Sequence, residues 1–150
     1  MPPPRLHLHY AIASFLCFLV ATNGSEILAS ALQTNTPLLS TVRKSFYYAV
    51  FAPLGTLFLA LPFFGVGIVS ANLAKVVGLF QAKVFFVSSV AALGALYLSG
   101  YWSAQQSLLA QKLTAAALSV GFLPFKSIAI LLLASIVAAL LFWREECANT

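Results

Sequence analysis

The feature that most constrains this chain is a stretch of thirty residues without a charge, between Lys44 and Lys75. Its central part, residues 46–71, is almost wholly apolar. About 20 apolar residues, each rising 1.5 Å, cross a hydrocarbon layer of about 30 Å. A chain in that layer has to satisfy its backbone hydrogen bonds internally, and a helix does so. The stretch therefore predicts a transmembrane helix over residues 46–71.

Composition extends this prediction to the rest of the chain. Of the 150 residues, 61% are hydrophobic and 7% are charged, whereas soluble domains carry about 25% charged residues. The mean hydropathy is +0.98. The net charge of +5 does not indicate nucleic acid, because the basic residues are dispersed and Arg43-Lys44 is their only adjacent pair. We expect the partners to be the lipid bilayer and other membrane helices, in a homo- or hetero-oligomer.

Three further apolar segments predict spans at about residues 10–32, 84–104 and 127–143. Residues 113–125 are apolar but too few to cross comfortably. They are expected to be interfacial or re-entrant, unless residues 113–143 form one helix kinked near Pro124. The predicted fold is an all-α integral membrane bundle of four transmembrane helices, with residues 1–150 forming a single multi-pass domain.

The first span has a second interpretation. A basic start and a short apolar core are also typical of a cleaved signal peptide, here residues 1–24. Glu26 raises the free energy of membrane insertion of the longer span by about 3 kcal/mol, but the large apolar residues of the span contribute roughly −3 to −5 kcal/mol. We therefore expect a retained helix to about Leu32. Four spans place four basic residues on each side of the membrane, so the orientation and the organelle stay open.

The third predicted span carries a small side chain at every fourth position. This spacing places the four residues on one face of a helix, which allows a second helix backbone to approach closely. We expect this face to form a helix–helix contact with an unspecified partner. The residues are Ala91, Ala95, Ser99 and Ser103.

The chain offers few groups for catalysis. It has no Asp and three Glu, of which only Glu26 lies in a predicted span. The sequence shows no carboxylate pair in the spans, no set of metal ligands and no nucleotide-binding glycine pattern, so neither a metal nor a cofactor is predicted. Glu26 is expected to be either a functional carboxylate or half of a structural ion pair, for which Lys126 is the predicted partner.

Three functions remain open at this point. The first is a non-enzymatic subunit or assembly partner of a larger membrane complex, favoured by the small-residue face and the scarcity of catalytic groups. The second is a small membrane enzyme for a lipophilic substrate, and the third is a small transporter or channel subunit built on the interrupted second span. The enzyme would draw on an external cofactor and on Glu26, Arg43, Tyr47, Tyr48 or Tyr101.

The length and the number of spans resemble those of small microsomal glutathione-transferase-like enzymes. The polar motifs of that family are not found here, so no residue is assigned from the resemblance.

Overall fold

The computed structural model describes residues 6–34, 37–51 and 53–148, with side chains except for residues 44–46, 48–51, 138 and 140–148. In these ranges every regular element is a helix, which confirms the predicted all-α fold. The helices are α1 (Leu6–Thr34), α2 (Leu38–Phe51), α3 (Pro53–Val76), α4 (Leu79–Leu109), α5 (Leu113–Gly121) and α6 (Leu123–Ala148).

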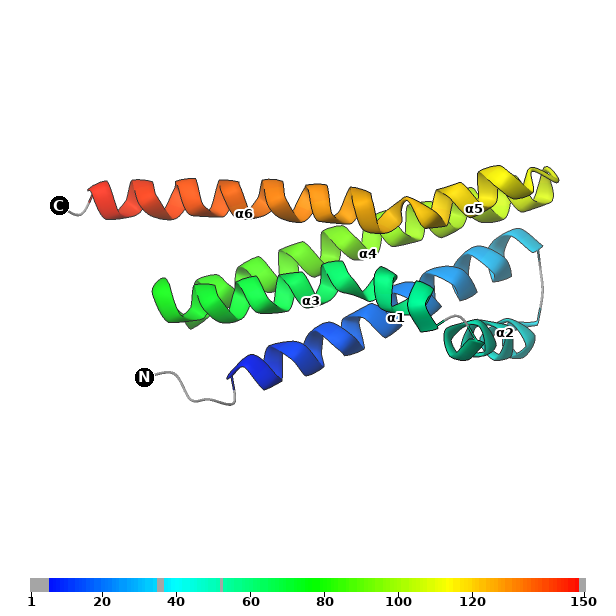
Figure 1. The fold of residues 1–150 in the computed structure, drawn as a ribbon, viewed down its shortest axis with the longest axis horizontal. Helices are drawn as coiled ribbons and strands as arrows, with labels where there is room; N and C mark the ends of the chain where they lie inside the picture. Colours follow the sequence, from blue (N-terminus) through cyan, green and yellow to red (C-terminus); the bar gives the residue numbers. More distant parts are fainter. Residues whose placement is uncertain (1–5, 35–36, 52, 149–150) are drawn as a thin grey trace.

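In the part of the chain that the structure describes, four helical stretches are long and apolar enough to cross a membrane. They are Leu6–Thr34, Pro53–Val76, Leu79–Leu109 and Leu113–Val137, with mean hydropathies of 1.6, 2.0, 1.7 and 2.2. The long helices run along a common direction, and the start of α1 and the end of α6 lie at the same end of the bundle (Figure 1). This is the arrangement that an even number of spans produces.

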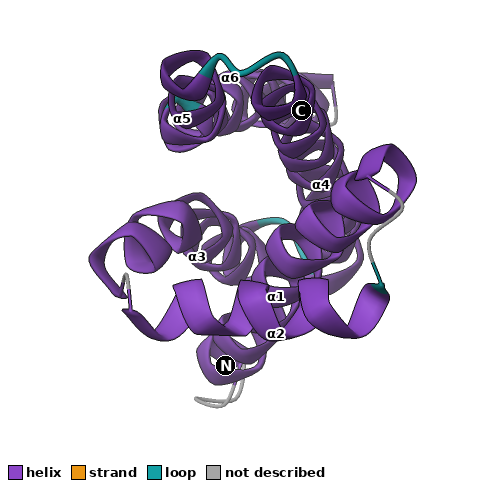
Figure 2. Ribbon diagram, turned by 90° about the vertical axis from the view of Figure 1, so that its right-hand side faces the viewer, coloured by secondary structure: helices purple, strands orange, loops and turns teal. Residues whose placement is uncertain are grey.

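The second apolar segment is divided between two helices. Residues 46–51 belong to α2, which lies across the end of the bundle, and α3 begins only at Pro53 (Figures 1 and 2). Proline is tolerated in the first helical turn because the backbone donor that it lacks would have no partner there. It also disfavours the helical conformation for the residue before it. The apolar residues counted as one span at 46–71 therefore run in two directions.

The structure places residues 113–125 in the fourth candidate span. Helix α5 ends at Gly121 with Phe122 as its C-cap, and α6 follows at once from Leu123, nearly in line with it (Figure 1). The Lys126 backbone N–H donates to the Phe122 carbonyl oxygen at 3.1 Å, which bridges the junction. Pro124 lies in the first turn of α6, where its missing donor costs little. Helix α5 and the first part of α6 thus cross the bundle together.

The core lies where α1, α3 and α4 meet, and α6 packs on α3 and α4. Three buried rings form its centre, because Phe63 contacts both Phe18 and Tyr97, with ring centroids 5.8 and 5.3 Å apart. The Tyr97 hydroxyl donates to the Leu59 carbonyl oxygen at 2.6 Å. This bond lies one turn before Pro62, a proline inside α3. The donor that Pro62 lacks would serve the neighbouring Phe58 carbonyl, so the bond to Leu59 ties α4 to a turn that the proline weakens.

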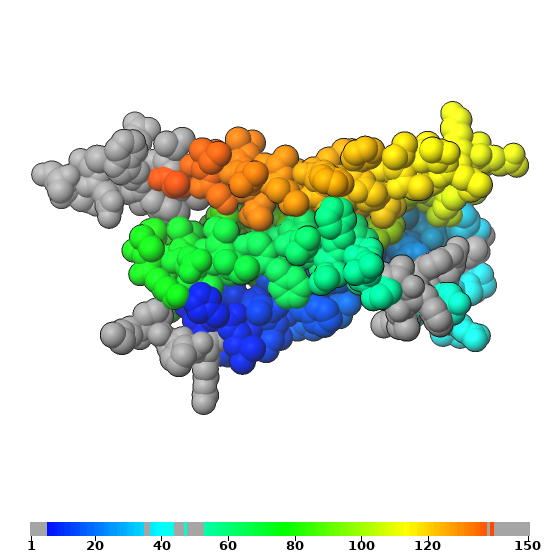
Figure 3. Space-filling model, in the orientation of Figure 1, coloured from blue at the N-terminus to red at the C-terminus, as the bar shows by residue number. Residues whose placement is uncertain are grey.

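Glycines allow the helices to approach closely at three points. A Cβ at Gly67 would contact the Ser14 hydroxyl, between α3 and α1. A Cβ at Gly100 would lie 2.5 Å from the Leu123 side chain, between α4 and α6. A Cβ at Gly65 would lie 2.8 Å from Leu131. The result is the layered surface of Figure 3, in which α3 lies between α6 and α1.

Candidate functional site

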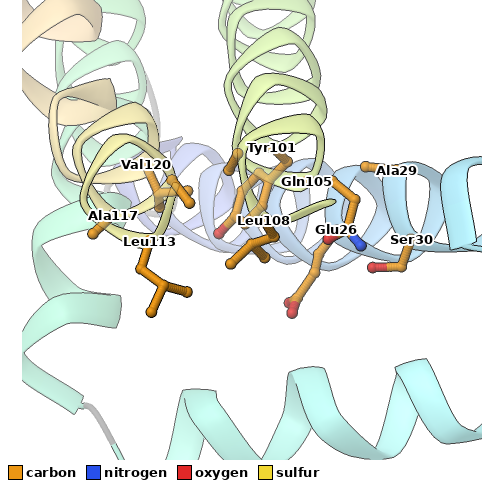
Figure 4. Close-up of a pocket in the computed structure, with 11 residues that line it drawn as sticks. Glu26, Ala29, Ser30, Tyr101, Gln105, Leu108, Leu113, Ala117 and Val120 are labelled. Atoms are coloured by element: carbon orange, nitrogen blue, oxygen red, sulfur yellow. The ribbon is translucent and has the colours of Figure 1, made fainter. Parts of the chain in front are cut away.

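A pocket of about 520 Å³ lies on α4, between α1 and α5. Both α1 and α5 contact α4, but in the described residues they do not contact each other. The space between them is therefore left open over one face of α4. Figure 4 shows its lining: Glu26, Ala29 and Ser30 of α1; Tyr101, Ala104, Gln105 and Leu108 of α4; and Leu113, Ala116, Ala117 and Val120 of α5.

The polar side of the pocket comes from α1 and α4. Glu26 and Ser30 are four residues apart, as are Tyr101 and Gln105, so each pair shares one helix face. Glu26 and Tyr101 are both half-buried. The Glu26 carboxylate extends from α1 toward the side where α2 lies (Figure 4). This side of the pocket thus holds a carboxylate, a phenol, an amide and a hydroxyl.

The opposite side of the pocket is apolar. Leu113, Ala117 and Val120 of α5 line this side, and Tyr101 and Leu108 lie between them and Glu26 (Figure 4). Leu108 at the end of α4 continues this surface. A molecule in the pocket would therefore meet hydrogen-bonding groups on one side and hydrocarbon on the other.

The groups that line this pocket can form hydrogen bonds and an ion pair. Its carboxylate can accept hydrogen bonds or pair with a cation, and its hydroxyl and amide groups can donate. The pocket lining contains no second carboxylate and no histidine to serve as the other half of an acid–base pair. In the part of the chain that the structure describes, no group of three His, Cys, Asp or Glu side chains could hold a metal ion.

Two of the candidate catalytic residues predicted from the sequence, Glu26 and Tyr101, meet in this pocket. Arg43 and Tyr47 lie on α2, are exposed, and do not line it. The side chain of Tyr48 lies outside the described residues.

The structure does not bring Lys126 to Glu26. Lys126 is exposed in the first turn of α6 and does not line the pocket. Leu123 and Ser127 occupy the buried face of that turn. The two side chains do not meet because their helices are not neighbours: in the described residues α6 contacts α3 and α4 but not α1.

The small-residue face of α4 points away from the chain's own core. Its four members are all exposed, and the Ser103 hydroxyl lies 3.4 Å from that of Ser119 on α5. The buried residues Leu93, Tyr97, Gly100 and Ala104 lie on another face of α4, so Ser103 is the member of the small-residue face for which a contact within the described chain is established. The predicted contact of Ala91, Ala95, Ser99 and Ser103 with another helix therefore stays a prediction for a partner outside this chain.

Sequence reasoning missed Ser30 and Gln105, the other two polar residues of the pocket. The sequence did hold a signal for them. Ser30 follows Glu26 by four residues and Gln105 follows Tyr101 by four, so each pair places two polar side chains on the same helix face. It also missed the close contact of α1 with α3, where Ser14 and Ser70 are buried without a hydrogen-bond partner for their hydroxyls. Ser70 and Ala74, four apart and both buried, marked that face.

Comparison with protein families, with curated proteins and with solved structures gives no match for this chain. Fold and pocket alone therefore define its class: an all-α bundle with four helices of membrane-spanning length and apolarity, and a half-buried carboxylate in a pocket between them.

Proposed function

We propose that this protein is a small multi-pass membrane protein that serves as a subunit or assembly partner of a larger membrane complex. The observation that carries this proposal is the exposed small-residue face of α4, formed by Ala91, Ala95, Ser99 and Ser103. Small side chains are enriched where membrane helices contact each other, because they let the backbones approach closely. A partner helix would fit this face.

The low burial of the apolar helices supports the same proposal. In the most apolar stretch of α4 only 11% of the residues are buried within the chain, and 17% in the corresponding stretch of Leu113–Val137. Lipid can cover large apolar side chains on such surfaces. The small side chains on α4 present little apolar surface to lipid, and they leave room for the backbone of a neighbouring protein helix.

Native mass spectrometry of the protein purified in a mild detergent tests this proposal. Ala95→Leu and Ser99→Leu place bulk on the small-residue face and should each release the chain from its complex. Ala129→Leu is the matched control, because Ala129 is also exposed but lies on α6. Circular dichroism should show the same helix content in all variants.

Two results would refute the proposal. One is a wild-type chain that stays monomeric both in detergent and in nanodiscs. The other is a complex of unchanged mass in both leucine variants. A pure homo-oligomer that turns over a lipophilic substrate would favour the enzyme instead.

A further inference from the structure

We infer that the pocket between α1, α4 and α5 binds an amphipathic amine, with its ammonium group at Glu26 and its apolar body against α5. This inference rests on the pocket and is independent of the partner proposed for the α4 face. Four observations bear on it: the state of the carboxylate, the groups around it, the opposite wall and the size of the pocket.

Among the side chains that the structure describes, Glu26 is a half-buried carboxylate without a cationic partner. None of the side chains that the structure describes forms an ion pair with it, and the predicted partner Lys126 lies elsewhere. A charge taken out of water is costly unless it is paired and hydrogen-bonded. A cationic ligand would supply the missing partner, and the charge of the site therefore selects an amine over an anion.

The neighbours of Glu26 suit an ammonium group. A primary ammonium has three donors, and the Glu26 carboxylate, the Gln105 amide oxygen and the Ser30 hydroxyl oxygen are acceptors on the same side of the pocket. The Tyr101 ring also lines the pocket, and an aromatic face attracts a nearby cation.

The opposite wall and the volume determine the rest of the ligand. Leu113, Ala117 and Val120 offer an apolar surface, which an uncharged polar or doubly charged ligand would not use. The volume of about 520 Å³ lies within the range of about 300–1,000 Å³ of small-molecule pockets. The ligand therefore combines one cationic head with a compact apolar body.

The test uses the full-length protein in phosphatidylglycerol nanodiscs, whose lipid has no ammonium group. The probes are adamantan-1-amine and adamantan-1-ol, which match in size and differ in charge. Isothermal titration calorimetry, with empty nanodiscs subtracted, should show that the amine binds at least about tenfold more tightly than the alcohol, since a hydrogen bond to a charged group contributes roughly that factor or more.

Variants separate the carboxylate from the pocket. The isosteric Glu26→Gln should remove the preference for the amine while the helix content stays unchanged. Lys75→Gln changes the net charge by one unit at an exposed position near the end of α3 and should keep the preference. Ala117→Trp fills the pocket and should weaken both probes.

The inference is overturned if wild-type protein does not bind the amine, if amine and alcohol bind equally, or if Glu26→Gln or Ala117→Trp leaves the binding of the amine unchanged. A second arm identifies the source of the ammonium group. Replacing part of the phosphatidylglycerol by phosphatidylethanolamine should weaken binding of the probe if a lipid headgroup is the natural occupant. Undiminished binding of the probe, still dependent on Glu26, supports a free lipophilic amine.

Discussion

The contact between α1 and α3 gives the sharpest prediction, because a single methyl group should disturb it. In Gly67→Ala the new Cβ would contact the Ser14 hydroxyl and would lie 3.1 Å from the Tyr10 carbonyl oxygen. Ser14 is fully buried, and the carbonyl belongs to the backbone, so neither can move aside freely. The two helices would have to separate by several tenths of an ångström along this contact.

The expected cost follows from overpacking. Inserting a methylene-sized group into a well-packed interior typically costs about 1–3 kcal/mol. A gap of 0.5–1 Å between packed atoms already loses a quarter to a half of their dispersion attraction. We therefore expect Gly67→Ala to lower the free energy of unfolding by about 1–3 kcal/mol. The measurement is unfolding in mixed micelles of dodecyl sulfate, followed by far-ultraviolet circular dichroism.

Two further variants make this prediction refutable. Gly94→Ala is the control, because a Cβ there would meet nothing within 4 Å, and helix propensity favours alanine by up to about 1 kcal/mol. Ser14→Ala removes the clashing hydroxyl and leaves a Cβ at 3.4 Å, so the double variant with Gly67→Ala should recover part of the loss. A Gly67→Ala variant as stable as Gly94→Ala, or strictly additive effects with Ser14→Ala, would refute the packing argument.

Three other predictions follow from buried contacts, all measured by the same unfolding assay. Tyr97→Phe removes the bond to the Leu59 carbonyl and should cost about 0.6 kcal/mol, the average for hydrogen bonds between membrane helices, and at most about 1.7 kcal/mol; an unchanged stability would contradict it. Gly100→Ala should cost about 1–3 kcal/mol by pressing on Leu123, and adding Leu123→Ala should not cost its full separate amount. Ser70→Ala should be neutral or stabilising, because the hydroxyl is buried without a partner; a loss above about 1 kcal/mol would show a bond that the structure lacks.

The sequence predicted the helices better than their boundaries. Uninterrupted apolar composition is enough to indicate a helix of spanning length, as in α3. The same composition does not say where the helix turns, so residues 46–51 were counted in a span although they belong to α2. Pro53 was visible in the sequence, but proline also occurs inside helices, as Pro62 does in α3. Only the packing of the whole chain distinguishes the two positions.

Individual residues of the pocket could be predicted from the sequence, but their proximity in the fold could not. Glu26 and Tyr101 were candidates because each is a reactive group in or near an apolar span. Their meeting depends on α1 lying beside α4, and hydropathy does not determine which helices are neighbours. The proposed pair with Lys126 assumed instead that the first and last spans are adjacent, whereas α6 packs on α3 and α4.

Helices α1 and α4 are longer than the hydrocarbon layer is thick, and this has a consequence in the bilayer proposed for this chain. Helix α4 has 31 residues and α1 has 29, so they are about 46 and 44 Å long at 1.5 Å per residue, against a hydrocarbon thickness of about 30 Å. Such helices tilt or project beyond the hydrocarbon. Glu26 and Gln105 both lie toward the ends of their helices, at the same end of the bundle. In that bilayer hydrophobic mismatch would act directly on the carboxylate: a thicker membrane would draw it into hydrocarbon, and a thinner one would leave it among the headgroups.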